Sequence, residues 1–242
     1  MTHELSVVLP IYNQADHLEA VVRAIAEVLR DHGYRFELIL VPNACRDESE
    51  AVCRALAETV PEVRVVVLVD GGWGRAVAAG LAASSGEVLC YANSARTHPS
   101  DLLQVVGLAR ANRLALIKAH RRSRESLDRR LGSFLFNGQC RLLFKLATWD
   151  INATPKAFSR DIYERVVRHA CSPGDLFDLE CHVICRERNV PTLEVPTYNW
   201  QRHAGRSTTN YRSAVRLYVG AITMWRARRG RLAAATGIQP DV

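Results

Sequence analysis

The chain has 242 residues, of which 48% are hydrophobic and 24% are charged, and its formal net charge is +7. This composition predicts an ordinary globular protein and excludes a disordered or low-complexity chain. No apolar run reaches the ~18 residues that span a bilayer, and the amino terminus lacks the residue order of a signal peptide. We therefore expect a cytoplasmic protein whose membrane contacts are peripheral. The positive charge favours an anionic partner, which is a phosphate-bearing substrate, an acidic membrane surface or nucleic acid.

The seven cysteines are odd in number and lie mostly within apolar patterns, as buried and reduced thiols do. A zinc site would have to use Cys171, Cys181, His182 and Cys185, but no second cysteine pair closes a tetrahedron. The sequence therefore predicts core packing for these residues and no metal site.

Strands and helices alternate along the first half of the chain. The expected strands are 5–11, 36–41, 63–69, 88–92 and 114–119, and the expected helices are 15–29, 48–59, 74–84 and 100–111. The strands are nearly continuous runs of Val, Leu and Ile, which indicates that helices cover both faces of the sheet. The pattern predicts an α/β fold with a mostly parallel, doubly wound sheet.

Polar segments follow four of these strands. They span residues 10–14, 41–47, 70–75 and 93–99. Ligands of doubly wound sheets bind outside the carboxyl ends of the strands. We therefore expect the binding pocket where these four segments meet.

The second half of the chain, from about His120, is more basic. Five arginines crowd residues 121–130, an amphipathic helix rich in Leu and Phe is expected over 131–146, and a second basic segment spans 201–208. A final amphipathic helix is expected from 210 to about 231. The Leu and Phe face of the first helix either lies on a membrane surface or packs on the sheet. We expect a single domain over 1–232, with halves 1–119 and 120–232, and a loose tail over 233–242.

Seven short segments, taken in chain order, together form a pattern that is typical of one protein family. They are 6–14, 36–47, 72–81, 150–158, 177–180, 194–196 and 202–207. The first resembles an opening strand with a Pro-x-Tyr-Asn-Glu turn, and the third a Gly-x-Gly-x-Ala helix start. Together they resemble the inverting family-2 glycosyltransferases of the GT-A fold, above all the branch that uses polyprenyl phosphates. The resemblance covers nearly the whole chain. It implies a GT-A fold and the transfer of a sugar from a UDP- or GDP-sugar to an acceptor.

The resemblance implies a donor site made of Pro10, Tyr12, Asn13, Gln14, Asn43, Arg75, Asn93, Ser94, Ala95 and Arg96. Where the family has an acidic pair after its second strand and an Asp-x-Asp motif, this chain has Pro42-Asn43 and Asn93-Ser94-Ala95. An amide brings no negative charge, so Mg²⁺ or Mn²⁺ gains far less here than from carboxylates. The sequence therefore supports neither ion as a cofactor. Arg96 either neutralises the diphosphate in place of a metal or points into solvent.

By the same resemblance an anionic acceptor, most simply a lipid phosphate, is held by Arg122, Arg130, Ser133, Arg202, Arg206 and Ser207. An alcohol acceptor needs a general base, whereas a phosphate is already anionic. Asp178 and Glu180 lie two residues apart and face different directions, so only one of them can enter the site. We expect Asp178 to be the base, with Asp150 as a second catalytic candidate. The alternative for Asp178 is a buried, ion-paired aspartate.

Three classes of function remain open. The ordered motifs favour an active glycosyltransferase. The missing carboxylates are also what a catalytically silent homologue would show if it bound a sugar nucleotide or a partner protein. The basic residues are not interleaved with aromatic residues in a nucleic-acid-binding pattern, so we expect no nucleic acid partner.

Overall fold

The computed structural model describes residues 3–122, 127–197 and 211–236. Within these ranges one sheet has the strand order β3-β2-β1-β4-β6-β5-β7. Its strands are β1 (Leu5–Ile11), β2 (Phe36–Pro42), β3 (Val63–Val65), β4 (Val88–Tyr91), β5 (Leu116–Arg121), β6 (Lys156–Ser159) and β7 (Thr192–Thr197). Only β6 runs antiparallel to its neighbours in this described sheet. The expected α/β fold with a mostly parallel sheet is confirmed.

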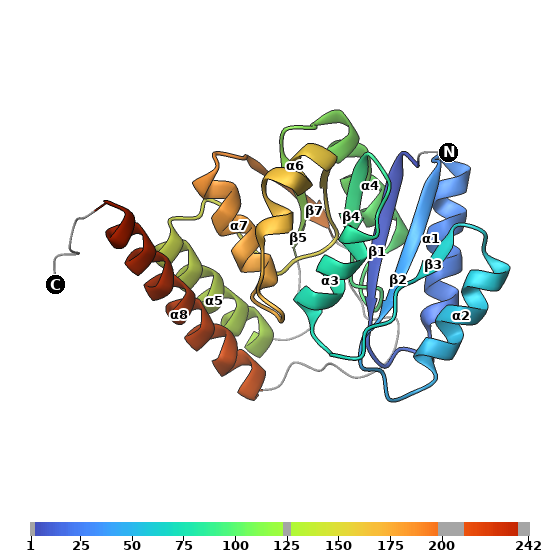
Figure 1. Cartoon of the computed structure of the whole chain (residues 1–242), viewed down its shortest axis with the longest axis horizontal. Helices are drawn as coiled ribbons and strands as arrows, with labels where there is room; N and C mark the ends of the chain where they lie inside the picture. The colour runs from blue at the N-terminus through green and yellow to red at the C-terminus, as the bar shows by residue number, and fades with distance from the viewer. Residues whose placement is uncertain (1–2, 123–126, 198–210, 237–242) are drawn as a thin grey trace.

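Helices cover both faces of the sheet (Figure 1). One hydrophobic cluster joins the sheet to α1 (Leu18–Asp31), α2 (Ser49–Thr59) and α4 (Pro99–Ala111). A second cluster joins the opposite face to α3 (Trp73–Ala82), α6 (Arg160–Arg165), η1 (Val167–His169) and α7 (Phe177–Glu187). The carboxyl ends of β1, β2 and β4 therefore open at one edge of a sheet that is shielded on both faces.

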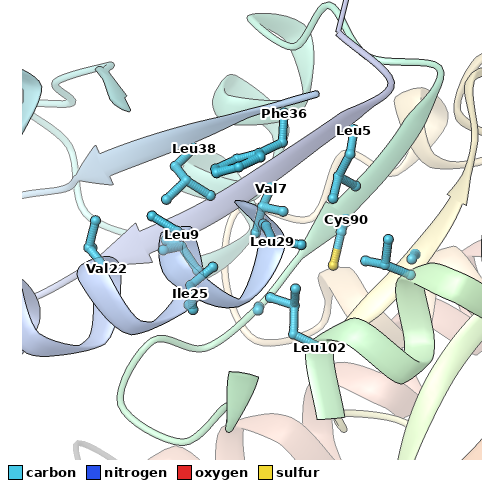
Figure 2. Close-up of a cluster of buried hydrophobic side chains, with 14 of the residues drawn as sticks. Leu5, Val7, Leu9, Val22, Ile25, Leu29, Phe36, Leu38, Cys90 and Leu102 are labelled. Atoms are coloured by element: carbon cyan, nitrogen blue, oxygen red, sulfur yellow. The ribbon is translucent and has the colours of Figure 1, made fainter. Parts of the chain in front are cut away.

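The first cluster shows why the amino-terminal half folds as predicted (Figure 2). The buried side chains of α1 are Leu18, Val21, Val22, Ile25, Ala26 and Leu29, which repeat at helical spacing. They face Leu9 and Leu38 of the sheet, and every residue of β1 and β2 is buried. Each large apolar side chain buried in this way contributes about 1.5–3 kcal/mol.

The helices α5 (Leu127–Phe144) and α8 (Tyr211–Thr236) lie side by side at one end of the sheet (Figure 1). Phe136, Cys140 and Phe144 of α5 belong to a third cluster that also includes Leu179 of α7 and Ala221 of α8. The inner row of α5 therefore packs on α7 and α8 instead of the sheet. No helix among the described residues is long and apolar enough to cross a membrane.

Some element boundaries differ from the predicted ones. The helix expected from residue 15 begins at Leu18, because the Gln14 and Ala15 N–H groups bond to the Ser49 hydroxyl and the Asp47 carboxylate. β3 ends at Val65, at the edge of the sheet, and Val69 is 91% exposed. α8 continues to Thr236, into the segment predicted as a tail. The remaining tail residues, 237–242, lie outside the described residues.

A buried acid in β2 gives a testable pH dependence. The Glu37 carboxylate accepts hydrogen bonds from the Ser6 hydroxyl at 2.7 Å, the Ser85 N–H at 2.6 Å and the Arg64 guanidinium at 2.7 Å. Burial acts to raise the pKa of Glu37, but these hydrogen bonds outweigh it and lower the pKa from 4.5 to about 2. Between these values the unfolded chain binds more protons than the folded one, so this contribution to stability is complete above pH 4.5 and is lost toward pH 2.

We expect Glu37→Gln to destabilise the protein at pH 7 and to flatten the loss of stability between pH 4.5 and 2. Urea denaturation at a series of pH values measures both effects. A variant with the same pH slope as the parent protein would contradict this assignment.

Candidate functional site

Three predicted donor segments meet at the carboxyl edge of the sheet, because β1 lies between β2 and β4. Asn13, which has a positive φ of 51°, accepts a hydrogen bond from the Arg46 N–H at 2.8 Å. The Gln14 side chain accepts one from the Ser94 hydroxyl at 2.5 Å. The loops after β1, β2 and β4 are thus bonded to one another. Pro10 is buried within β1, and Tyr12 is 38% exposed.

Asn43 connects two of these loops to the start of α3. Its side-chain N–H donates to the Ile11 carbonyl at 2.7 Å, and its side-chain oxygen accepts from the Gly72 N–H at 3.1 Å. A carboxylate at this position could not donate to Ile11. The asparagine therefore suits a role in joining the loops, and a nucleobase would have to compete with these main-chain contacts. Nearby, the Arg75 guanidinium donates to the Gly71 carbonyl at 3.1 Å.

The loop after β4 offers no charged oxygen at the position of the family's carboxylate motif. The Asn93 side chain accepts from the Ala95 N–H at 3.0 Å, and Ser94 and Ala95 are buried. Arg96 is partly exposed. Of the nearby acids, Asp47 accepts hydrogen bonds from Ala15 and Ser49.

The loop after β4 would present amide, hydroxyl and methyl side chains to a divalent ion, and no carboxylate. The described part of the chain contains no group of three His, Cys, Asp or Glu side chains that could hold a metal. The group considered for zinc also lacks that geometry, since Cys181, His182 and Cys185 are buried in the interior and Cys171 is exposed. Burial acts to raise the pKa of Asp47, but its hydrogen bonds outweigh this and lower it, so the carboxylate stays ionised and bonded within the protein.

Asp178 lies in a buried group with Trp73, Tyr91 and Lys156, at the start of α3 and the end of β4. One carboxylate oxygen accepts from the Tyr91 hydroxyl at 2.7 Å and from the Lys156 ammonium, and the other accepts from the Trp73 indole N–H at 2.9 Å. Asp178 is 3% exposed and Lys156 is fully buried. Burial and the charge of Asp178 raise the pKa of Tyr91 well above its usual value, so its hydroxyl stays a donor. Asp178 is therefore buried and ion-paired in this structure, and its role as a base stays a prediction.

Asp150, the second catalytic candidate, is also paired. Its carboxylate accepts two hydrogen bonds from the Arg121 guanidinium, at 2.8 and 2.6 Å, and one from the Arg121 N–H at 3.1 Å. Burial acts to lower the pKa of Arg121, but the charge and hydrogen bonds of Asp150, together with the charge of Asp178, outweigh it and raise that pKa. Asp150 has a positive φ of 46°.

The candidate acceptor residues are only partly within the described structure. Arg122, just after β5, is exposed, and its N–H donates to the Thr197 carbonyl. The Ser133 hydroxyl accepts from the Asn137 side chain at 3.0 Å. Arg202, Arg206 and Ser207 lie outside the described residues, as does the side chain of Arg130.

A further ion pair, not expected from the sequence, joins buried Lys118 to partly exposed Glu194 and holds the segment before Asp150. The Lys118 ammonium donates to the Trp149 carbonyl at 2.7 Å and lies 3.1 Å from a Glu194 oxygen. Burial lowers the pKa of Lys118 to about 8. The same Glu194 oxygen accepts from the Trp149 N–H at 2.8 Å, so the lysine and the glutamate together fix the Trp149 main chain.

The outer side of α5 carries four exposed apolar side chains, Leu131, Phe134, Leu135 and Leu142, which we call the α5 stripe. Phe134 stacks on Trp149 with 5.7 Å between ring centroids, and the Arg141 guanidinium lies 4.2 Å from the Trp149 ring. Val215 and Val219 of the neighbouring α8 are exposed as well. Since the inner row of α5 is packed in the core, the helix has two apolar faces, of which one is solvent-exposed.

Comparison with known proteins supports the resemblance to family-2 glycosyltransferases. The sequence matches the family model of Glycosyl transferase family 2 over residues 6–167. It is 22% identical over 234 residues to the undecaprenyl-phosphate 4-deoxy-4-formamido-L-arabinose transferase of Enterobacter sp. (strain 638), covering 91% of this chain and 67% of the relative. The enzyme of the same name from Pseudomonas fluorescens (strain Pf0-1) is 23% identical over 248 residues, with 97% and 68% covered.

Among solved structures, the fold resembles glucosyl-3-phosphoglycerate synthase from Mycobacterium tuberculosis in complex with Mn²⁺, UDP and phosphoglyceric acid. The TM-score is 0.71 at 22% identity, with 92% of this chain and 78% of the other covered. The complex of that enzyme with Mg²⁺ and UDP gives a TM-score of 0.70 at 19% identity, with 92% and 79% covered. These likenesses confirm the predicted GT-A fold, and the family match shows that the chain belongs to glycosyl transferase family 2.

Proposed function

We propose that this chain is an inverting glycosyltransferase that moves a sugar from a UDP- or GDP-sugar to a polyprenyl phosphate. The family match supports sugar transfer, and the relatives whose names specify undecaprenyl phosphate support the acceptor class. The observation that carries the proposal is the state of the candidate bases. Asp178 and Asp150 are both held in ion pairs, so the acceptor that suits this site is one that needs no deprotonation.

The reaction then requires few protein groups. An oxygen of the acceptor phosphate forms a bond to the anomeric carbon while the bond to the nucleoside diphosphate breaks on the opposite face. The electron pair leaves with the diphosphate, and the configuration of the sugar is inverted. No proton is transferred, so the protein has to orient the two substrates and stabilise the charge that develops on the leaving diphosphate.

The donor would lie along Tyr12, Asn13, Gln14 and the loop from Asn93 to Arg96, where the strand-end loops are bonded together. In this proposal Arg75 and Arg96 supply the positive charge that carboxylate-bearing relatives obtain from a metal, because a guanidinium offers two parallel donors to phosphate oxygens. Asn43 contributes indirectly, by holding Gly72 at the edge of the site.

The acceptor side would face a membrane. A polyprenyl phosphate keeps its chain in the bilayer and presents its phosphate at the surface, so the enzyme has to work there. The α5 stripe provides an apolar face beside a basic segment, which is the composition of a helix that lies in the interface. We therefore propose peripheral association with the cytoplasmic face of a membrane, with Arg122, Arg130, Arg202 and Arg206 near the lipid phosphate.

The test is a transfer assay with undecaprenyl phosphate and a panel of UDP- and GDP-sugars, which measures released nucleotide and the glycosylated lipid. We expect product with an inverted anomeric configuration, which NMR of the product determines. Nucleotide binding without product would identify a catalytically silent homologue. Product with an alcohol acceptor alone would return Asp178 to the role of base.

A nucleotide-binding measurement tests metal dependence. The donor loops lack the carboxylates that a hard cation prefers. We therefore expect UDP or GDP affinity to change by less than about twofold when EDTA replaces Mn²⁺, measured by titration calorimetry, because a neutral amide adds little to cation binding. A large loss of affinity in EDTA would show that other carboxylates of the chain supply a metal site.

A further inference from the structure

The start of α3 is held by a turn that is distant from it in the sequence. The Arg75 N–H donates to the Pro173 carbonyl at 3.1 Å. A Cβ added at Gly72 would lie 2.4 Å from the Pro173 oxygen, and one added at Gly74 would lie 2.0 Å from the Ser172 oxygen. The two glycines therefore allow residues 171–174, which we call the 171–174 turn, to pack directly on the first turn of α3.

Glu180 of α7 holds this turn in place. One of its carboxylate oxygens accepts from the Cys171 N–H at 2.9 Å and from the Ser172 N–H at 2.7 Å. Hydrogen bonds from two main-chain amides to one ionised oxygen are charge-assisted and directional. The position of the 171–174 turn is therefore set by a side chain of α7.

Arg228 of α8 in turn holds Glu180. Its guanidinium lies 3.4 Å from the second Glu180 oxygen and bonds to both oxygens of Glu187 at 2.7 and 2.5 Å. The Arg228 side chain is 16% exposed and that of Glu180 is 14% exposed, so both are shielded from most of the solvent. A continuous series of contacts thus runs from α8 through Glu180 and the 171–174 turn to α3.

The end of this series is the proposed donor site. The Gly72 N–H is bonded to Asn43, and Arg75 lies in the first turn of α3. We propose that Glu180 is a positioning residue for the donor site, because it fixes the turn on which Gly72 and Arg75 rest. This inference depends on the proposed function only in taking that edge as the donor site. It also gives separate roles to the two acids in the first turn of α7, since Asp178 accepts from Trp73 while Glu180 holds the turn.

Variants of Glu180, Glu187 and Arg228 test this inference. Glu180→Ala removes the acceptor of both amides, whereas Glu180→Gln keeps an oxygen that can accept them. Glu187→Ala is the matched control, since Glu187 binds the same arginine, whereas the amides of the turn donate to Glu180. Amide hydrogen exchange of the free protein measures how strongly the main chain of residues 72–75 is protected. Calorimetry with UDP and GDP measures the affinity of the donor site.

We expect Glu180→Ala to accelerate exchange at Gly72 and Arg75 and to weaken nucleotide binding about tenfold, because small displacements of positioning groups have large effects. Glu180→Gln and Glu187→Ala should stay within about twofold of the parent protein, since both keep the amide contacts. Arg228→Met, a milder change, should give an intermediate loss.

Two outcomes would overturn the inference. One is a folded Glu180→Ala protein with unchanged exchange and affinity. The other, if that variant does not fold, is an Arg228→Met protein with no change in either measurement. A parent protein that binds neither UDP nor GDP would instead refute the proposed function, and the exchange experiment would still decide whether Glu180 controls the start of α3.

Discussion

Replacing Lys156 by methionine is expected to lower the free energy of unfolding by about 3–5 kcal/mol, the range for breaking a buried ion pair by removing one partner. The change leaves the Asp178 carboxylate in an interior where it is 3% exposed, with only the Tyr91 and Trp73 donors remaining. Two neutral donors do not replace a cation in a region of low polarity. Urea denaturation at pH 7 measures the loss.

Two controls make this result specific. The double variant Lys156→Met/Asp178→Asn has no buried charge. The amide oxygen of the new asparagine can still accept from Trp73, so most of the lost stability should return. Arg168→Met removes an exposed pair with Glu164 on α6 and η1 and should cost less than about 1 kcal/mol. If Lys156→Met matched the exposed control, Asp178 would not depend on its lysine and would remain available as a base.

The double variant Leu135→Glu/Leu142→Glu is expected to reduce binding to anionic vesicles by about a hundredfold. These two leucines are 53% and 81% exposed, so in solution they stabilise little of the core. Burying a leucine in an apolar environment contributes about 1.5–3 kcal/mol, so losing two such contacts removes roughly 3 kcal/mol or more of membrane binding. Sedimentation with phosphatidylglycerol and phosphatidylcholine vesicles measures the partition.

Leu114→Glu is the matched control, because Leu114 is 70% exposed but lies just before β5, outside α5 and α8. It should leave vesicle binding unchanged. High salt should release the parent protein in part, since the basic residues near α5 contribute a screened attraction. Equal binding by the parent protein and the stripe variant would mean that the α5 stripe does not contact lipid.

The sequence predicted the first half of the fold well because its signals are local. The runs in β1 and β2 are long and apolar, and the repeat in α1 is regular, so each element could be recognised alone. β6 is short and contains a lysine and a serine, and it enters the sheet between β4 and β5 in the reverse direction. Nothing in four such residues indicates that position, which is decided by the packing of distant segments.

The sequence predicted which strand-end loops meet, but it did not predict the hydrogen-bond and ion-pair partners of the candidate site residues. The strand-end rule located the loops at Asn13, Asn43 and Ser94, which the structure joins. The partners of Asp178 come from three other elements, and one of them, Trp73, is 105 residues away in the sequence. A single sequence contains no signal for such pairings, so it could not decide between a base and a buried ion pair.

The hydrogen bonds of Asn43 also restrict how this donor edge can change. Aspartate at position 43 would replace the side-chain donor to the Ile11 carbonyl with an oxygen and bring two oxygens together, although the main-chain N–H of residue 43 would still donate to that carbonyl at 3.0 Å. Aspartate at position 95 would have to place a charge where Ala95 is 2% exposed. A carboxylate at position 43 or 95 therefore costs stability unless the residues that contact it change as well, so these two positions of the donor edge are coupled to Ile11, Gly72 and the buried loop after β4.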